Sequence, residues 1–254
     1  MNLQKIILFG LIAISTFSCT PKHWVITGAT STKIAIDSST DKLADKNYEN
    51  YLQPFKQRID TQMNVVIGQA AETMKGNAPE SLLSNFNADV YRQVATDFSG
   101  QKVDIAVVNL GGLRTVIPAG NITIRKVFEL MPFENELVIL WLKGDKLNDL
   151  LQFFASVGGE GVSGLRMEIS HGKAVNISID GKPLDPEKLY SIATNDYLAG
   201  GNDKMVQLGQ YEKRLNTGLK IRTVLLDYIK NETKKGNQIQ SKLDGRITLM
   251  TPNP

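Results

Sequence analysis

The feature that most constrains the fold is the segment Val103–Val108, which is rich in β-branched residues and lies between turn signals. Such a run is typical of a strand that is buried on both faces of a sheet. A second apolar run, Leu137–Leu142, has the same character. Strands of this kind need cover on each face, so the chain is predicted to form a sheet with flanking helices.

Apolar residues at helical spacing predict those helices. The clearest stripe is Leu83–Phe98, which follows Pro79-Glu80-Ser81 and ends at Ser99-Gly100. A helix that begins near Tyr48 would carry Pro54 in its first turn, where the missing N–H costs little. Further helices are predicted over 124–131, 147–157 and 221–235.

The second half of the chain has the pattern of β-hairpins. Apolar runs over 165–170, 175–179 and 190–194 are separated by His171-Gly172 and Asp180-Gly181, and both dipeptides favour tight turns. Short strands are also predicted at 65–67 and 247–250. Because strand–helix alternation and hairpins occur in one chain, we predict the α/β (α+β) class: a single mixed-sheet domain with flanking helices over residues 47–254.

The first residues have the pattern of a secretory signal. Lys5 precedes an apolar run, Ile6–Phe17, which is too short to span a membrane and ends just before Cys19, the only cysteine of the chain. We predict a lipoprotein signal peptide over residues 1–18 and lipidation at Cys19. Residues 19–46 are predicted to be a tether, with short strands at 25–27 and 33–37. Cleavage at a nearby alanine-type site, which would leave a free thiol, is the alternative.

Composition and motifs exclude several functions. Lys and Arg number 29 against 26 Asp and Glu, a balance that argues against binding of a nucleic acid polymer. The two histidines, His23 and His171, are too few for a dinuclear metal site. No nucleophile elbow, Walker loop or Gly-x-Gly-x-x-Gly motif occurs. These observations indicate a binding domain with no catalytic residue, metal ion or cofactor of its own.

Two glycine-rich loops carry the candidate binding residues. Each follows a predicted strand, the position at which open α/β sheets bind their ligands. In the first loop Arg114 suits a phosphate group, and Phe133 further along offers a face to a planar ring. In the second loop Tyr197 offers another ring, and Asp203 can accept hydrogen bonds from sugar hydroxyls. From the pattern alone, packing roles for the two aromatic residues and a surface ion pair for Arg114 remain alternatives.

These residues resemble the C-terminal domain of the 5′-nucleotidase/UDP-sugar hydrolase family. The resemblance consists of six segments in the family's order between about Glu80 and Met205. They are Asn109–Arg114 (NLGGLR), Pro118–Thr123 (PAGNIT), Leu130–Asn135 (LMPFEN), Leu142–Gly144 (LKG), Ser163–Arg166 (SGLR) and Tyr190–Ala199 (YSIATNDYLA).

The resemblance implies a substrate-binding role. In that family this domain binds the nucleotide, while a separate N-terminal metallophosphatase domain hydrolyses the phosphate ester. The resemblance implies that two aromatic side chains sandwich the base, an asparagine orients it, an arginine faces the phosphate or ribose, and an aspartate holds the ribose hydroxyls. The substrate-binding residues implied in this way are Asn109, Gly111, Gly112, Arg114, Phe133, Asn195, Tyr197 and Asp203.

The chain departs from the family pattern at several positions. A family glycine is replaced by Ser84, although the following Asn85 is kept. A family arginine falls near Asn77, where the nearest cation is Lys75. The family's Gly-Gly-Asp-Gly becomes Gly200–Lys204 (GGNDK). In addition, no His-rich motif precedes the matching region.

We therefore expect this chain to be the nucleotide- or nucleoside-binding half of a split 5′-nucleotidase, inactive alone. Divalent metal ions are expected only in a separate metallophosphatase chain. One alternative is a stand-alone scavenging lipoprotein that binds nucleosides or nucleotides, and another is a structural surface module whose pocket is no longer used. The expected location is the cell envelope, on the periplasmic face or the cell surface, with a membrane anchor at Cys19.

Overall fold

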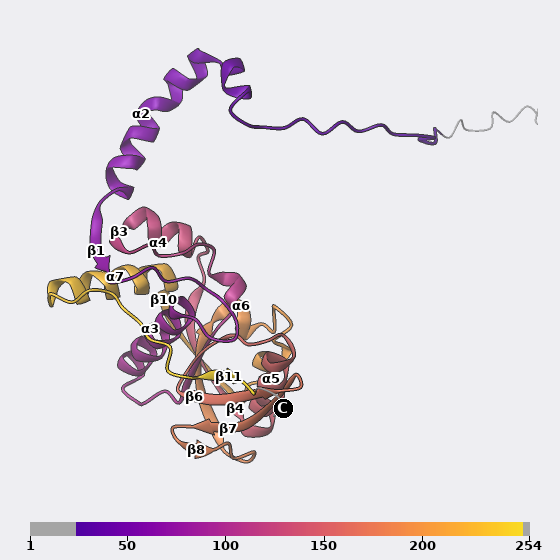
Figure 1. Cartoon of the computed structure of the whole chain (residues 1–254), viewed down its shortest axis with the longest axis vertical. Helices are drawn as coiled ribbons and strands as arrows, with labels where there is room; N and C mark the ends of the chain where they lie inside the picture. Colours follow the sequence, from indigo (N-terminus) through magenta and orange to yellow (C-terminus); the bar gives the residue numbers. More distant parts are fainter. Residues whose placement is uncertain (1–23, 251–254) are drawn as a thin grey trace, which may run out of the picture. The chain divides into compact units, whose positions relative to one another are not determined.

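The computed structural model describes residues 24–250, and the chain divides into two compact units, Met1–Leu52 and Gln53–Pro254 (Figure 1). The predicted signal peptide and Cys19 lie outside the described residues. In the first unit, residues 24–36 have no regular structure, and η1 (Thr40–Leu43) precedes the start of α2 (Lys46–Met63). The short strands predicted at 25–27 and 33–37 are therefore wrong. Exposed side chains such as Ile34 and Ile36 gain no burial there, and an extended segment without a neighbouring strand is not stable.

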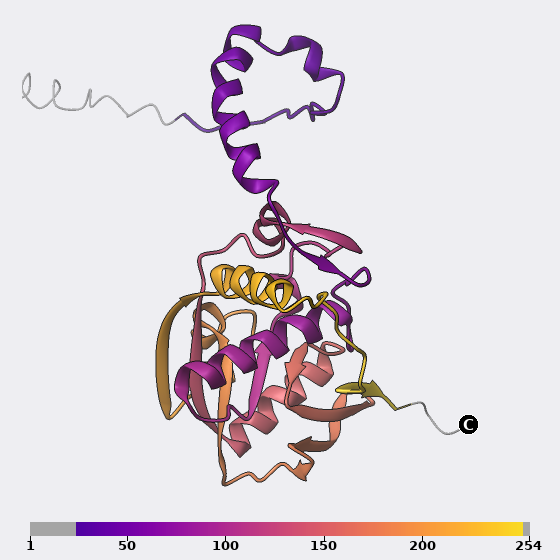
Figure 2. The same ribbon diagram turned by 90° about the vertical axis from the view of Figure 1, so that its left-hand side faces the viewer.

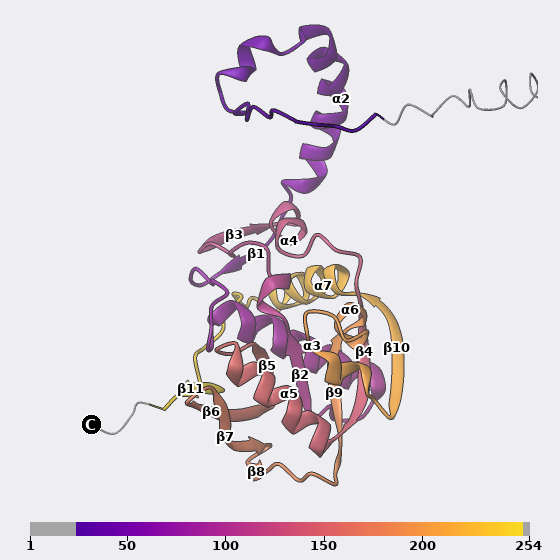
Figure 3. The ribbon, with the colours of Figure 1, turned by 90° about the vertical axis from the view of Figure 1, so that its right-hand side faces the viewer.

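A five-stranded mixed sheet forms the centre of the second unit, in the order β10-β4-β9-β2-β5 (Figure 3). Its strands are β2 (Ile105–Val108), β4 (Glu136–Lys143), β5 (Gly161–Ser163), β9 (Leu189–Asn195) and β10 (Lys213–Lys220). Strand β2 runs parallel to β9, and the other neighbours are antiparallel. The strands predicted at 103–108 and 137–142 are confirmed as β2 and β4, which flank the central strand β9.

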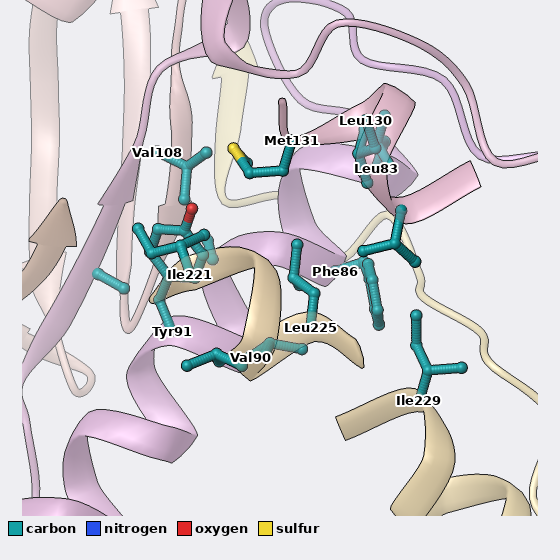
Figure 4. Packing of buried hydrophobic residues seen from close by; sticks show 14 of the residues in the cluster. Leu83, Phe86, Val90, Tyr91, Val108, Leu130, Met131, Ile221, Leu225 and Ile229 are labelled. Carbon is teal, nitrogen blue, oxygen red and sulfur yellow. The ribbon is translucent and has the colours of Figure 1, made fainter. Parts of the chain in front are cut away.

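Helices α3 (Leu82–Ser99) and α7 (Ile221–Lys234) lie side by side and cover one face of the sheet (Figure 2). Figure 4 shows their apolar side chains packed together with Val108 of β2. The other face packs against α5 (Gly144–Ser156) and the smaller sheet described below. Successive residues of β2 alternate between the two cores, Ala106 and Val108 facing one and Ile105 and Val107 the other. This alternation explains why the strand is apolar throughout.

The ends of α3 follow the sequence signals closely. Ser81 is the N-cap, and its side chain accepts a hydrogen bond from the backbone N–H of Ser84. Gly100 follows the last turn with a φ of 67°, the left-handed conformation that glycine adopts without steric cost. The helix predicted between Pro79-Glu80-Ser81 and Ser99-Gly100 is confirmed.

A four-stranded sheet, in the order β11-β6-β7-β8, holds the hairpins of the second half. Its strands are β6 (Leu165–Ser170), β7 (Lys173–Ile179), β8 (Lys182–Pro183) and β11 (Ile247–Leu249). Both residues of the turns His171-Gly172 and Asp180-Gly181 have positive φ, which matches the right-handed twist of the flanking strands. The two predicted hairpin turns are confirmed, and the edge strand predicted near 247–250 pairs with β6.

The strands β1 (Val66–Ala70) and β3 (Gly120–Thr123) form a two-stranded sheet, and β1 lies next to α7. Strand β3 leads directly into α4 (Ile124–Leu130). A Cβ at Gly68 would lie 2.6 Å from Oγ1 of Thr233, so this glycine allows β1 to approach α7 closely. The short elements α6 (Asp196–Ala199), η2 (Leu110–Gly112) and η3 (Val206–Gly209) complete the unit. Within residues 24–250, no helix has the length and apolar character that crossing a membrane requires.

Candidate functional site

The topology brings four separate segments to one edge of the central sheet. Because β2 and β9 are parallel neighbours, the loops that follow them leave from the same edge. Strands β4 and β5 run the opposite way, so the segments that precede them arrive there. The pairing of Leu137 with Asn195, and of Val108 with Gly161, fixes this meeting point. It is the edge at which open α/β sheets bind ligands.

A cavity of about 220 Å³ lies at this edge. All eight residues predicted from the resemblance line it. Two further lining residues, Met131 and Asn135, were not predicted, although both belong to the matched segment around Phe133. The complete lining is Asn109, Gly111, Gly112, Arg114, Met131, Phe133, Asn135, Asn195, Tyr197 and Asp203.

The first loop, Asn109–Arg114, is built around η2. The backbone N–H groups of Gly112 and Leu113 donate to the carbonyl oxygens of Asn109 and Leu110, and Arg114 N donates to Leu130 O at 3.1 Å. Asn109 itself is buried. A Cβ at Gly112 would lie 2.6 Å from the Asn109 side-chain oxygen, so only glycine fits against that amide.

Asp203 connects the two loops across the cavity. One of its carboxylate oxygens accepts from Asn109 Nδ2 at 2.5 Å, and the other accepts from the Tyr197 hydroxyl at 2.8 Å. Its backbone has a φ of 53°, and Lys204 follows with 64°. Two successive non-glycine residues in the left-handed region are uncommon and cost free energy. In this backbone conformation the Asp203 side chain lies at the cavity.

Phe133 and Tyr197 are half-exposed at the cavity, with 45% and 43% of their surface accessible. The guanidinium of Arg114 lies 5.9 Å from the centre of the Phe133 ring, and its Nη1 donates to Gly111 O at 3.1 Å. The cavity therefore has an aromatic residue on each of two segments and a cation beside one of them. Such surfaces favour planar and anionic groups.

Asn195 and Asn135 have partners of their own. The side chain of Asn195 caps α6 by accepting from Leu198 N at 2.7 Å. Asn135 Nδ2 donates to Asp196 at 2.8 Å. These bonds fix the short helix that carries Tyr197, so both asparagines orient the second aromatic residue as well as lining the cavity.

Two groups at this edge have shifted pKa values. The hydrogen bond from the Tyr197 hydroxyl to Asp203 raises the pKa of Tyr197, because the neutral phenol is the donor. Burial raises the pKa of Glu160, and the nearby Asp203 raises it further, while a hydrogen bond from Leu110 N opposes both effects. Asp203 is thus the main cause of the Tyr197 shift and a lesser cause of the Glu160 shift, for which burial comes first.

Two of the departures from the family pattern, at Ser84 and near Asn77, lie outside the cavity lining, whereas the third, Gly200–Lys204, contributes Asp203 to the lining. Ser84 takes part in the cap of α3 with Ser81. Asn85 Nδ2 donates to Glu80 at 2.6 Å and to the Lys242 carbonyl at 2.8 Å, which ties α3 to the C-terminal segment. The side chain of Lys75 does not line the cavity either. Among the cavity-lining residues, Arg114 is the one cation.

Across residues 24–250, no three His, Cys, Asp or Glu side chains are grouped closely enough to hold a metal ion. The prediction that metal ions belong to a partner chain stays a prediction. A larger hollow of about 400 Å³ lies elsewhere and is lined by several charged residues. There Arg246 pairs with Asp89 at 2.7 Å and Arg166 bonds to Asp244, so these four charged groups already have partners.

Comparison with known proteins identifies the protein family to which this fold belongs. Residues 62–210 match the family model of the 5′-nucleotidase C-terminal domain. The chain belongs to this family, and its mixed-sheet fold is that of the family's C-terminal domain.

Several relatives show the extent of the likeness. Protein UshA of Yersinia enterocolitica is 30% identical over 204 residues, which cover 78% of this chain and 37% of that protein. A 5′-nucleotidase of Vibrio parahaemolyticus is 27% identical over 214 residues, which cover 79% of this chain and 38% of that protein. The crystal structure of a 5′-nucleotidase precursor from Thermus thermophilus superposes with a TM-score of 0.69 at 29% identity, covering 84% of this chain and 45% of that one. The chain thus spans less than half the length of each of these relatives.

Proposed function

We propose that this chain binds a nucleoside or nucleotide in the edge cavity and serves as the substrate-binding half of a split 5′-nucleotidase. The observation that supports this most is the arrangement around Asp203. Two half-exposed aromatic side chains, an aspartate and an arginine surround one cavity, and they come from segments far apart in the sequence. Family membership and the names of the relatives support the same ligand class.

Each part of a nucleoside has a matching group. A purine or pyrimidine ring placed between Phe133 and Tyr197 would stack on both faces, at about 1–3 kcal/mol for each base–aromatic contact. The Asp203 carboxylate has acceptor sites beyond the two already used, and vicinal sugar hydroxyls are donors of suitable chemistry. A phosphate would lie toward Arg114.

The size of the cavity agrees with partial enclosure. Pockets that enclose a whole drug-sized ligand measure about 300–1,000 Å³, whereas this cavity measures about 220 Å³. We infer that the domain holds the base and sugar and leaves the phosphate exposed. An exposed phosphate would be accessible to a second protein that carries the hydrolytic centre.

Hydrolysis is therefore assigned to a partner. A metallophosphatase chain would supply the divalent metal ions and the activated water, and the present chain would supply affinity and orientation for the substrate. Lipid attachment at Cys19 would hold this half at the cell envelope, on the periplasmic face or the cell surface. The chain alone would not hydrolyse nucleotides.

Calorimetric titration of the full chain with adenosine and AMP, at low and high salt, tests the binding role. Binding of AMP that weakens with salt, and that is lost in Phe133→Ala, is the expected result. Phe98→Ala is a matched control, because Phe98 on α3 is also 45% exposed but does not line the cavity. Absence of binding by the unaltered chain would contradict the proposal.

The split-enzyme role needs a second assay. AMP hydrolysis should appear only when a metallophosphatase chain and its metal ions are added, and Phe133→Ala should lower it. If AMP is hydrolysed by the chain alone, the assignment of hydrolysis to a partner is wrong.

Equal affinity for adenosine and AMP at every salt concentration, with no hydrolysis alongside a partner, would instead favour the second candidate, a nucleoside-scavenging lipoprotein. The observation that favours this candidate is that only one cation, Arg114, lines the cavity, so the cavity has little positive charge with which to hold a phosphate.

A further inference from the structure

Glu160 lies at the same sheet edge as the cavity without being part of its lining. The pairing of Val108 with Gly161 puts Glu160 opposite the start of the first loop. Its Oε2 accepts a hydrogen bond from Leu110 N at 2.7 Å. A Cβ at Gly161 would lie 2.9 Å from the Val108 carbonyl oxygen, so the two segments are in close contact. Glu160 is therefore held where it can act on the loop.

The bond to Leu110 lies one residue from the centre of the site. Leu110 is the first residue of η2, and the preceding Asn109 donates its side-chain N–H to Asp203. Glu160 thus fixes the backbone at the start of the turn, and Asp203 fixes the adjacent side chain. Together the two carboxylates hold the loop from two different segments of the chain.

The charge of Glu160 is not explained by stability. Its pKa is raised, chiefly by burial, so folding favours the protonated form. The contribution of this group to stability is complete at low pH and is lost as the pH rises through the raised pKa. At neutral pH the carboxylate costs stability that an uncharged acceptor would not. What the residue supplies is a side-chain oxygen that accepts from Leu110 N–H, so its role at the loop lies in this hydrogen bond and not in its charge.

We propose that Glu160 is a positioning residue for nucleoside binding, holding the Leu110–Gly112 turn so that Asn109 and the two glycines present a fixed wall to the ligand. This inference rests on the proposed function, because it assigns Glu160 a role in that same site. Glu160 acts through the backbone of Leu110 and does not touch the ligand. Its removal would loosen the wall of the cavity while the aromatic residues and Asp203 stay in place.

Three variants of the full chain test this assignment. Glu160→Ala removes the acceptor, and Glu160→Gln keeps a carbonyl acceptor while it removes the charge. Glu187→Ala is the control, because this exposed glutamate precedes the opposite end of β9. Two quantities are measured for each: adenosine affinity by calorimetry, and hydrogen–deuterium exchange of the peptide that contains residues 109–114.

Adenosine should bind Glu160→Ala about tenfold more weakly than the unaltered chain, the loss expected for one hydrogen bond to a part-buried N–H group. The 109–114 peptide should exchange faster in that variant. Glu160→Gln should bind adenosine nearly as well as the unaltered chain and unfold at a higher temperature at neutral pH. If Glu160 affected binding only through the stability of the fold, adenosine affinity and unfolding temperature would change together in each variant.

Unchanged affinity and exchange in Glu160→Ala would overturn the assignment, as would a Glu160→Gln variant that binds as weakly as Glu160→Ala. If the unaltered chain binds no adenosine, the proposed function itself fails. The exchange data then decide the role of Glu160 separately. Faster exchange in Glu160→Ala alone supports its hold on the turn, and equal exchange in all variants refutes it.

Discussion

The two loops that meet at the cavity are held in different ways. The first, residues 109–114, is tied by backbone bonds at Gly112, Leu113 and Arg114 and rests on the buried side chain of Asn109. The part of the second loop that carries Asp203, residues 200–204, is mostly exposed, and its last two residues are in the left-handed region. The comparison shows that the first loop is fixed by backbone hydrogen bonds and one buried side chain. The second places its carboxylate through its local backbone conformation.

The largest effect is expected in the first loop. Gly112→Ala would force its Cβ against the buried Asn109 amide, so we expect a loss of about 1–3 kcal/mol in the free energy of unfolding. Adenosine affinity should fall with it, because Asn109 must move away from Asp203. Chemical denaturation and calorimetry measure the two losses.

Gly111→Ala is the control for that substitution. No atom lies within 4 Å of a Cβ at this neighbouring glycine. We expect its unfolding free energy to stay within about 0.5 kcal/mol of the unaltered chain. Equal destabilisation by both variants would show that the first loop is not held by its contact with Asn109.

In the second loop, binding should lose more than stability. Asp203→Ala removes an exposed carboxylate outside both apolar cores, so only its hydrogen bonds to Asn109 and Tyr197 are lost and we expect the free energy of unfolding to fall by about 1 kcal/mol. Adenosine affinity should fall by about 1–3 kcal/mol, as for other charge-assisted hydrogen bonds. If Asp203→Ala unfolds as easily as Gly112→Ala, the two loops do not differ in the way described.

A smaller effect concerns the pKa of Tyr197. Its hydrogen bond to Asp203 raises this pKa, so the bond is present at neutral pH and is lost as the pH rises through the raised value. Asp203→Ala should return the pKa of Tyr197 toward the ordinary tyrosine value of about 10. Tyrosinate absorbance, with the Tyr197→Phe titration subtracted, measures the change. An unchanged titration would mean that the hydroxyl is not bonded to Asp203.

The smallest effect is expected at Lys204, whose φ is 64°. Glycine adopts this conformation without the steric cost that other residues carry, so Lys204→Gly should stabilise the fold by less than about 1 kcal/mol. Adenosine affinity should not change, because Lys204 does not line the cavity. A destabilised variant would show that the Lys204 side chain has a structural contact of its own.

Local signals in the sequence predict most of the helices and strands, whereas the residues of the candidate site are predicted through the family resemblance. The helix α3 has a serine cap, an apolar stripe and a final glycine, and each signal acts within a few residues. The strand β10 could not be predicted because none of its eight residues is buried and five are partly buried without alternation, which leaves a weak pattern at a sheet edge. The role of Glu160 also could not be predicted, because its partner Leu110 lies 50 residues away and is reached only through the pairing of β2 with β5.

The six matched segments differ in what they do in the fold. Those containing Asn109, Phe133 and Tyr197 line the cavity. Others maintain close packing: a Cβ at Gly144 would lie 1.9 Å from the Asp185 carbonyl, and one at Gly164 would lie 2.1 Å from the Asp104 carbonyl. A shared motif therefore marks either a ligand site or a backbone contact, and only the three-dimensional arrangement separates the two.

The crystal structure of the full chain with adenosine tests the central claim most directly. The account predicts the base between Phe133 and Tyr197, with the ribose hydroxyls on Asp203 and the 5′ carbon directed toward solvent near Arg114. Adenosine bound at another place, or a cavity that stays closed by the Phe133 and Tyr197 side chains at saturating ligand, would contradict it.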